Sequence, residues 1–479
     1  MINNNKLFPE NFLWGASTSA YQVEGAAEKY GKELSQQDIL NNNPDFADTH
    51  ITSDHYHRYK EDVALMKELG LKSYRFSIAW SRIFPEGIGK VNDKGVEFYH
   101  NLIDELLKND ITPIPTLYHY DMPMALVEKY HGWINRQSVE DFAYYAEFVI
   151  KEYGKKVKYW LTINEQSIIV QFWTKKCLIP DHYLHDEQIK YQINHHMNLA
   201  HAIACKLVHQ WVPNGLVGAA LGYSAIYPLT SKPEDNVAAQ NANDLRNYYF
   251  TDIYLKGHYN QSALTYLRNH GLAPHIEVGD MELIKEGYSD FLAINYYCSH
   301  AAAAAPKGAQ RRMDGFNPTG VKGQIDGYEI QPDFFQIHKN PHIDTTDWDW
   351  SIDPIGLEYL LRDLYSRYQK PLMITENGFG ADDKLESDNS IHDDYRIHYI
   401  QQHLNAIKRA MNYGVKVISY NPWSFIDVLS TSNGYKKRYG FVYVNRTDKD
   451  IKDLSRYKKD SFYWYQNVIQ TQGGSLTKR

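Results

Sequence analysis

Short apolar segments of β-type composition alternate with longer amphipathic segments along the whole 479-residue chain. Parallel βαβ units produce this alternation, because each buried strand needs a crossover before the next parallel strand. Eight segments have the length and composition of strands: 12–15, 73–77, 112–117, 159–163, 216–221, 291–295, 372–375 and 415–420. No linker rich in Gly, Ser or Pro divides the chain. The alternation therefore favours an α/β fold in which residues 1–479 form one (β/α)8 TIM barrel with long loops at its C-terminal face.

Amphipathic helices are expected between these strands. Apolar side chains recur at helical spacing in residues 54–69, 98–108, 139–153 and 395–413. Glycines that follow these segments, at Gly70, Gly154 and Gly414, are expected to end the helices. Residues 300–350 have no regular period and contain an Ala run at 301–305, so we expect an irregular loop after the sixth strand.

Composition and charge exclude several classes of function. A formal net charge of −7 argues against nucleic acid as a partner, and no apolar run is long enough to span a membrane. Three cysteines give no disulfide framework, which indicates a reducing compartment. No signal-peptide pattern stands at the N-terminus, so we expect a cytoplasmic protein. Without a metal-ligand cluster or a glycine-rich nucleotide loop, we expect no metal and no cofactor.

Polar side chains gather where the predicted strands end. Seven residues lie at or just beyond these carboxyl ends: Arg75, His119, Glu165, Asn295, Tyr297, Glu376 and Trp423. In a (β/α)8 barrel this face carries the active site. Two of the seven, Glu165 and Glu376, are carboxylic acids far apart in sequence. Hydrolysis of a glycosidic bond by an acid and a nucleophile requires such a pair of carboxyl groups. The alternative to this catalytic role is that each Glu forms an ion pair at the protein surface.

Five motifs make the chain resemble glycoside hydrolase family 1, the retaining β-glycosidases on a (β/α)8 barrel. They are FPENFLWGASTSAYQVEG at 8–25, YRFSIAWSRIFP at 74–85, TLYHYDMP at 116–123, TENG at 375–378 and NPW at 421–423. The resemblance implies that Glu376 is the nucleophile and Glu165 the general acid/base, with carboxyl groups about 5–5.5 Å apart. The family acid usually stands before Pro, whereas Gln166 follows it here, a change that concerns loop stiffness rather than proton chemistry.

The resemblance also implies supporting and binding roles. The groups that keep the nucleophile ionised would be Arg75, Tyr297 and Asn295. The first sugar would be bound by Gln22, His119, Asn164 and Trp423. Amide and imidazole groups match sugar hydroxyls, and an indole matches the apolar face of a pyranose. Trp350 resembles the Trp on which the aglycone of the substrate stacks in the family. The alternative interpretation is that Trp350 is a residue of the hydrophobic core.

The segment 430–440 discriminates between branches of the family. Members that act on unphosphorylated glucosides generally carry Glu where Ser430 stands. The 6-phospho-glycosidases resemble this chain, with Ser, Lys and Tyr at the spacing of Ser430, Lys437 and Tyr439. A hydroxyl, an ammonium and a phenol bind a phosphate dianion that a carboxylate would repel. Thr431 stands where the 6-phospho-β-galactosidase branch tends to have Trp, which favours the 6-phospho-β-glucosidase branch.

These observations predict a retaining hydrolase that converts 6-phospho-β-glucosides to glucose 6-phosphate and an aglycone. Its partner would be a small phosphorylated β-glucoside, with no nucleic acid and no membrane, and the oligomeric state is left open. Ser430 argues against an ordinary β-glucosidase and Thr431 against a 6-phospho-β-galactosidase. The third alternative, a carbohydrate-binding relative without catalysis, is opposed by the presence of both Glu165 and Glu376.

Overall fold

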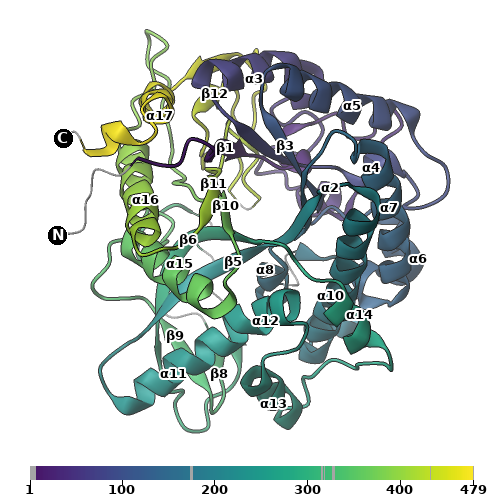
Figure 1. Cartoon of the computed structure of the whole chain (residues 1–479), viewed down its shortest axis with the longest axis vertical. Coiled ribbons are helices and arrows are strands. Elements are labelled where there is room, and N and C mark those ends of the chain that lie inside the picture. Colours follow the sequence, from purple (N-terminus) through teal and green to yellow (C-terminus); the bar gives the residue numbers. More distant parts are fainter. Residues whose placement is uncertain are drawn as a thin grey trace.

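The computed structural model describes residues 7–172, 176–313, 317, 319–325, 329–431 and 433–477. Among these residues, eight parallel strands form a closed barrel (Figure 1). In order around the barrel they are β1 Leu13–Ser17, β2 Ser73–Ser77, β3 Thr112–Tyr118, β4 Tyr159–Asn164, β5 Leu216–Pro228, β6 Leu292–Ala303, β10 Leu372–Glu376 and β11 Val417–Tyr420. Pairing of β11 with β1, and of β10 with β6, closes the barrel. The predicted (β/α)8 fold is confirmed.

Helices surround the barrel on the outside (Figure 1). The described α-helices are α1 Ala20–Val23, α2 Gln36–Leu40, α3 His55–Leu69, α4 Trp80–Ile83, α5 Asp93–Lys108, α6 Met124–Tyr130, α7 Gln137–Tyr153, α8 Gln166–Gln171, α10 Glu187–Trp211, α11 Pro233–Asn243, α12 Tyr249–Lys256, α13 Gln261–Asn269, α14 Asp280–Glu286, α15 Pro354–Tyr368, α16 Asp394–Asn412 and α17 Asp460–Gln470. The four predicted amphipathic segments correspond to α3, α5, α7 and α16. Gly70 ends α3 in the left-handed conformation at φ 89°, which a residue without a side chain adopts at low cost.

The prediction of an irregular loop at 300–350 was wrong in part, because four short stretches of this range lie in strands while its other described residues are irregular. Strand β6 continues through Ala303 and pairs with β9, Phe335–His338, which pairs in turn with β8, Glu329–Gln331. Strand β7, Arg312–Met313, pairs with β8 and completes this antiparallel extension. Strand β5 also runs to Pro228, seven residues beyond the predicted end, and accompanies β6 above the barrel. A run of Ala side chains shows no apolar–polar alternation, so the sequence carried no strand signal there.

The core has two parts. A small cluster inside the barrel consists of buried side chains from the strands, among them Ile114, Leu161 and Met373. A much larger cluster fills the space between the strands and the surrounding helices. This double burial explains why strand segments such as Leu372–Glu376 are buried at every position rather than at every second one.

Two features that are absent from the described residues bear on the class of function. No helix formed by them has both the length and the apolar character that crossing a bilayer requires. Within the same residues, no three His, Cys, Asp or Glu side chains converge as a group that could hold a metal ion. His55 and His57 illustrate this, since the first bonds to Asp62 inside the protein and the second to Asp54 at its surface.

Candidate active site

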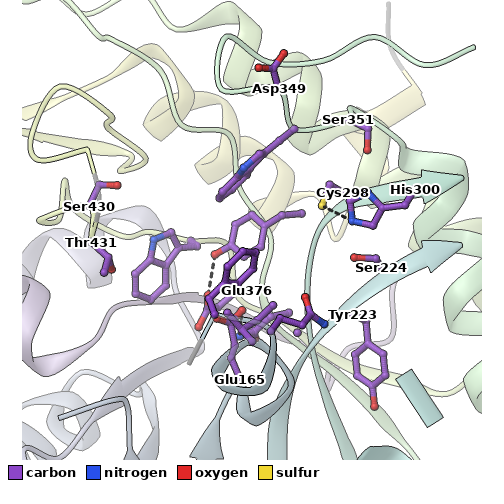
Figure 2. A pocket seen from close by; sticks show the side chains of 18 of the residues that line it. Glu165, Tyr223, Ser224, Cys298, His300, Asp349, Ser351, Glu376, Ser430 and Thr431 are labelled. Carbon is purple, nitrogen blue, oxygen red and sulfur yellow. Dashed lines mark hydrogen bonds between the residues drawn. The ribbon is translucent and has the colours of Figure 1, made fainter. Parts of the chain in front are cut away.

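Both predicted glutamates line one cavity of about 310 Å³ at the carboxyl ends of the barrel strands. Glu376 is the last residue of β10, and Glu165 directly follows β4. Figure 2 shows the two side chains together at the bottom of the cavity, with Ser430 and Thr431 on one side and Ser224 and His300 on the other. The fold therefore brings together two carboxyl groups that lie more than two hundred residues apart in sequence.

Glu376 is held by one cation and one hydroxyl. Arg75 Nη1 lies 2.5 Å from its Oε1, and Tyr297 Oη donates to its Oε2 at 2.8 Å. Arg75 is fully buried on β2 and also donates to Thr116 Oγ1 at 2.9 Å and to Asn164 Oδ1 at 2.6 Å. Each guanidinium nitrogen thus has a defined acceptor, which fixes the charge beside Glu376 rather than leaving it mobile.

Glu165 has a different, uncharged set of partners. Asn295 Nδ2 donates to its Oε1 at 3.1 Å, and Tyr120 Oη donates to its Oε2. Its backbone adopts the left-handed conformation, with φ 45°. Gly222 on β5 leaves room for this arrangement, because a Cβ there would come within 3.3 Å of Glu165 Oε1. No cation contacts Glu165 within hydrogen-bonding distance among the described residues.

Two of these partners differ from the prediction. Asn295, expected to support Glu376, directs its amide to Glu165 and to Asn164 Oδ1, each at 3.1 Å. Tyr120 was not predicted at all, although it lies inside the motif at 116–123 and directly follows His119. Its role follows from a backbone turn at φ 72°, a conformation that a residue other than Gly rarely adopts and that no local sequence pattern indicates.

Burial and mutual repulsion decide how the pair titrates. Burial raises the pKa of Glu376 to about 7, and the Glu165 carboxylate raises it as well, whereas Arg75 and the Tyr297 hydroxyl lower it. Protons bind to such interacting carboxyl groups as a pair, so this pKa belongs to the two groups together.

The four predicted sugar-binding residues all contribute to this cavity or its wall. Gln22, His119 and Trp423 line it, and Asn164 Nδ2 contacts His119 Nε2 at 3.1 Å. Burial lowers the pKa of His119 well below its ordinary value, so the imidazole is neutral. The rings of Trp423 and His119 are nearly parallel at 18°, with centroids 6.0 Å apart. Gln22 is fixed by bonds to Ser19 and to the carbonyl of Leu429.

The three predicted phosphate-binding residues converge on the same cavity. Ser430, Lys437 and Tyr439 all line it. Only 2% of Lys437 is exposed, and no carboxylate forms an ion pair with it in the part of the chain that the structure describes. Burial lowers the pKa of its ammonium to about 7. A buried ammonium without an anionic partner is unfavourable unless a ligand supplies the anion.

Gln166 stands in the interior of a hydrogen-bond network. Its Nε2 donates to Asn194 Oδ1 and Asn198 Oδ1, both at 2.7 Å on α10, and its Oε1 accepts from Tyr254 Oη on α12. The residue is fully buried and directly follows Glu165. The amide thus anchors the loop that carries Glu165 by bonds to two helices, at the position where the family that the sequence resembles usually has Pro.

We expect Gln166→Leu to destabilise the protein by about 3 kcal/mol or more. Leucine is of similar size but leaves the buried Asn194, Asn198 and Tyr254 groups without their partner, at a cost of about 1–3 kcal/mol for each unsatisfied group. Urea unfolding of this variant and of Gln369→Leu, a surface control at the end of α15, measures the difference. Equal unfolding midpoints for the two variants would contradict an anchoring role of Gln166.

Comparison with known proteins places the chain in a family. The sequence profile of glycosyl hydrolase family 1 matches residues 4–474. The aryl-phospho-β-D-glucosidase BglC of Bacillus subtilis (strain 168) is 46% identical over 478 residues, with 98% of each chain covered. The 6-phospho-β-glucosidase of Dickeya chrysanthemi is 40% identical, with 98% of this chain and 99% of that protein covered. The solved family 1 β-glucosidase from Thermotoga maritima matches with a TM-score of 0.86 at 32% identity, over 98% of this chain and 99% of that one. The sequence, the fold and the paired carboxyl groups agree, and the chain belongs to glycosyl hydrolase family 1.

Proposed function

We propose that this enzyme hydrolyses 6-phospho-β-D-glucosides with retention of configuration, releasing glucose 6-phosphate and the aglycone. The observation that carries the phosphate specificity is the buried Lys437 ammonium, which has no carboxylate partner among the described residues and lies in one cavity with Ser430 and Tyr439. The Bacillus relative, an aryl-phospho-β-D-glucosidase, and the Dickeya relative, a 6-phospho-β-glucosidase, support the same substrate class. Thr431, whose hydroxyl lies 2.8 Å from the hydroxyl of Tyr21, stands where the 6-phospho-β-galactosidase branch tends to have Trp, and this supports a gluco rather than a galacto preference.

In the first step Glu376 attacks the anomeric carbon and Glu165 protonates the departing oxygen. The guanidinium of Arg75 stabilises the negative charge on Glu376, whereas Glu165 has only neutral donors, so we assign the role of proton donor to Glu165. The bond from the anomeric carbon to Glu376 forms as the bond to the aglycone oxygen breaks. Retaining glycosidases form such a covalent glycosyl-enzyme intermediate.

In the second step Glu165, now deprotonated, accepts a proton from water. The water oxygen attacks the anomeric carbon from the side that the aglycone left, and Glu376 departs as a carboxylate. Tyr120 and Asn295 keep the Glu165 carboxyl group oriented through both steps. Two inversions at one carbon give net retention, with a carboxyl separation of about 5–5.5 Å expected for this pathway.

Two further statements belong to the same proposal. We place the enzyme in the cytoplasm, since its cysteines, Cys177, Cys205 and Cys298, are free thiols and its substrate is a phosphorylated small molecule. We also treat residues 1–479 as one catalytic domain, because both glutamates and the phosphate-binding segment come from strand ends and loops of one barrel.

The stereochemical course of hydrolysis tests the proposed function. Proton NMR during hydrolysis of 4-nitrophenyl β-D-glucopyranoside 6-phosphate is expected to show the β-anomer of glucose 6-phosphate before mutarotation. First appearance of the α-anomer would contradict double displacement, and absence of hydrolysis would contradict the proposed substrate class.

We expect the preference for phosphorylated substrate to fall as pH rises above about 7. The ammonium of Lys437 has a pKa of about 7, so the free enzyme progressively loses this charge at higher pH, by up to about tenfold per pH unit. Glu376, whose pKa is also raised to about 7, titrates in the same range, but its ionisation affects both substrates and therefore cancels in the ratio of kcat/KM with and without the 6-phosphate.

Lys437→Arg is the matched control for this pH dependence. A guanidinium stays protonated at every pH used, so the ratio of the variant is expected to be flat between about pH 7 and 9. A wild-type ratio that is equally flat over that range would contradict the role given to Lys437.

A further inference from the structure

Aromatic rings, rather than carboxylates, surround the ammonium of Lys437. Its Nζ lies 3.6 Å from the ring centroid of Trp350, 4.9 Å from that of Trp348 and 5.6 Å from that of Tyr439. A cation within about 6 Å of a ring face is attracted by the negative face of the π system. Gly380 makes this packing possible, because a Cβ there would come within 2.8 Å of both the Lys437 side chain and the Tyr439 ring.

The two tryptophans occupy different positions around this cation. Trp348 is only 3% exposed and does not line the substrate cavity, so it lies behind the ammonium. Trp350 lines the cavity, and its ring meets that of Tyr297 with centroids 5.2 Å apart. Since Tyr297 donates to Glu376, the aromatic contacts connect the phosphate end of the cavity with its catalytic end.

The residue between the two tryptophans anchors their segment. Asp349 has a left-handed backbone at φ 62°, and its buried carboxylate accepts backbone hydrogens from Gly323 at 2.7 Å and Gln324 at 2.9 Å. Asn317 Nδ2 donates to the same carboxylate at 2.8 Å. Lys436, the neighbour of Lys437, donates from Nζ to the carbonyl of Thr319, which belongs to the same stretch of chain as Gly323 and Gln324. Figure 2 shows Asp349 at the upper edge of the cavity, away from the two glutamates.

An aromatic environment suits a phosphate-binding lysine for a physical reason. Indole faces stabilise the charged ammonium by their quadrupoles but accept none of its three hydrogens as fully as an oxygen does. A carboxylate would stabilise the charge more strongly and would then repel the incoming phosphate. Rings therefore hold the ammonium in place and leave its hydrogens available to a dianion.

We propose that Trp348 and Asp349 are positioning residues for phosphate recognition: Asp349 fixes the segment 348–350, and the indoles of Trp348 and Trp350 hold Lys437 for the substrate's 6-phosphate. This inference rests on the proposed function. Trp348 thereby contributes to substrate specificity, although its side chain does not line the cavity that holds Glu165 and Glu376. Replacing either residue affects binding of the phosphorylated substrate far more than the chemical step.

The test uses two substrates, 4-nitrophenyl β-glucoside and its 6-phosphate, and determines kcat and KM in wild type, Trp348→Leu, Trp348→Phe and Asp349→Ala. Trp348→Leu and Asp349→Ala are expected to raise KM for the phosphorylated substrate about tenfold, with kcat within about twofold, since an interaction present in both ground and transition states changes KM alone. Trp348→Phe retains a ring face and is expected to recover most of the affinity. Its loss of Nε1 costs no bond, because this atom has no hydrogen-bond partner among the described residues.

Trp211→Leu is the matched control. Trp211 also carries a lysine over its ring, with Lys151 Nζ at 4.1 Å, but it is 42% exposed on α10. We expect this variant to leave both substrates unchanged. Calorimetric titration with glucose 6-phosphate provides a second measurement that does not depend on turnover, and the same order of affinities is expected.

Three outcomes separate the possibilities. A wild type with equal kcat/KM on the two substrates overturns the proposed function, and the inference with it. A wild type that prefers phosphorylated substrate, together with unaltered KM in Trp348→Leu and Asp349→Ala, overturns only the positioning role. Equal losses on both substrates, carried by kcat and not recovered in Trp348→Phe, identify Trp348 as a structural core residue and also overturn it.

Discussion

Replacing Glu376 by alanine is expected to lower kcat by a factor on the order of 10⁵, because the covalent intermediate can no longer form. Arg75 and Tyr297 remain in place and keep an anion-sized space beside the anomeric carbon. Added azide or formate is therefore expected to restore part of the activity and to give a product of inverted configuration. Rates with and without azide, with the product identified by NMR, measure this effect.

Glu165→Ala is the matched comparison for the two roles. Substrates with good leaving groups need little protonation, so 4-nitrophenyl substrates should still form the glycosyl-enzyme intermediate in this variant, whereas alkyl glucosides should not. Azide is expected to speed turnover by attacking the intermediate and giving a retained product. If both variants lost activity equally for every leaving group, the roles of nucleophile and acid/base would be assigned wrongly.

Ser430→Glu is expected to lower the preference for phosphorylated substrate by about a hundredfold. Ser430 lines the cavity beside Tyr439 and Lys437, where a carboxylate would repel a phosphate dianion and pair with the free ammonium. Free sugar hydroxyls can donate to the new carboxylate, so kcat/KM for the unphosphorylated glucoside should rise. Measuring kcat/KM for both substrates in one preparation gives the change in preference.

Ser366→Glu, which adds the same charge at an exposed position of α15, is the control for this substitution. It is expected to leave the preference unaltered at moderate ionic strength, because surface charges are screened beyond about 8–10 Å. Equal changes in Ser366→Glu and Ser430→Glu would show that net charge alone, rather than a local phosphate site, governs the preference.

The barrel was predictable because buried parallel strands have a local signal, whereas the extension of β6 was not. A segment such as Leu372–Glu376 is apolar and bounded by helical patterns, and burial on both faces requires nothing from distant residues. The Ala residues at the end of β6 form a strand because the end of β5 pairs with them on one side and β9, more than thirty residues away, pairs with them on the other. Pairing between segments so far apart in sequence does not require an apolar–polar alternation in the Ala run, so no local pattern predicts it.

The same distinction applies within the site. Glu165, Glu376 and Arg75 stand in motifs whose residue types are dictated by the chemistry, so they could be assigned from sequence. Tyr120 could not, because its contact with Glu165 depends on a left-handed turn. The aromatic surroundings of Lys437 could not either, since they combine two loops separated by almost ninety residues.

The central claim is tested most directly by comparing two substrates, 4-nitrophenyl β-D-glucopyranoside and its 6-phosphate, through the ratio of their kcat/KM values. A site built for a dianion leaves two or three buried donors unpaired when the phosphate is missing, at about 1–3 kcal/mol each. The account therefore predicts a preference on the order of 10²–10⁴ for the phosphorylated substrate at about pH 7. Comparable values for the two substrates would contradict it and would make the enzyme an ordinary β-glucosidase of the family.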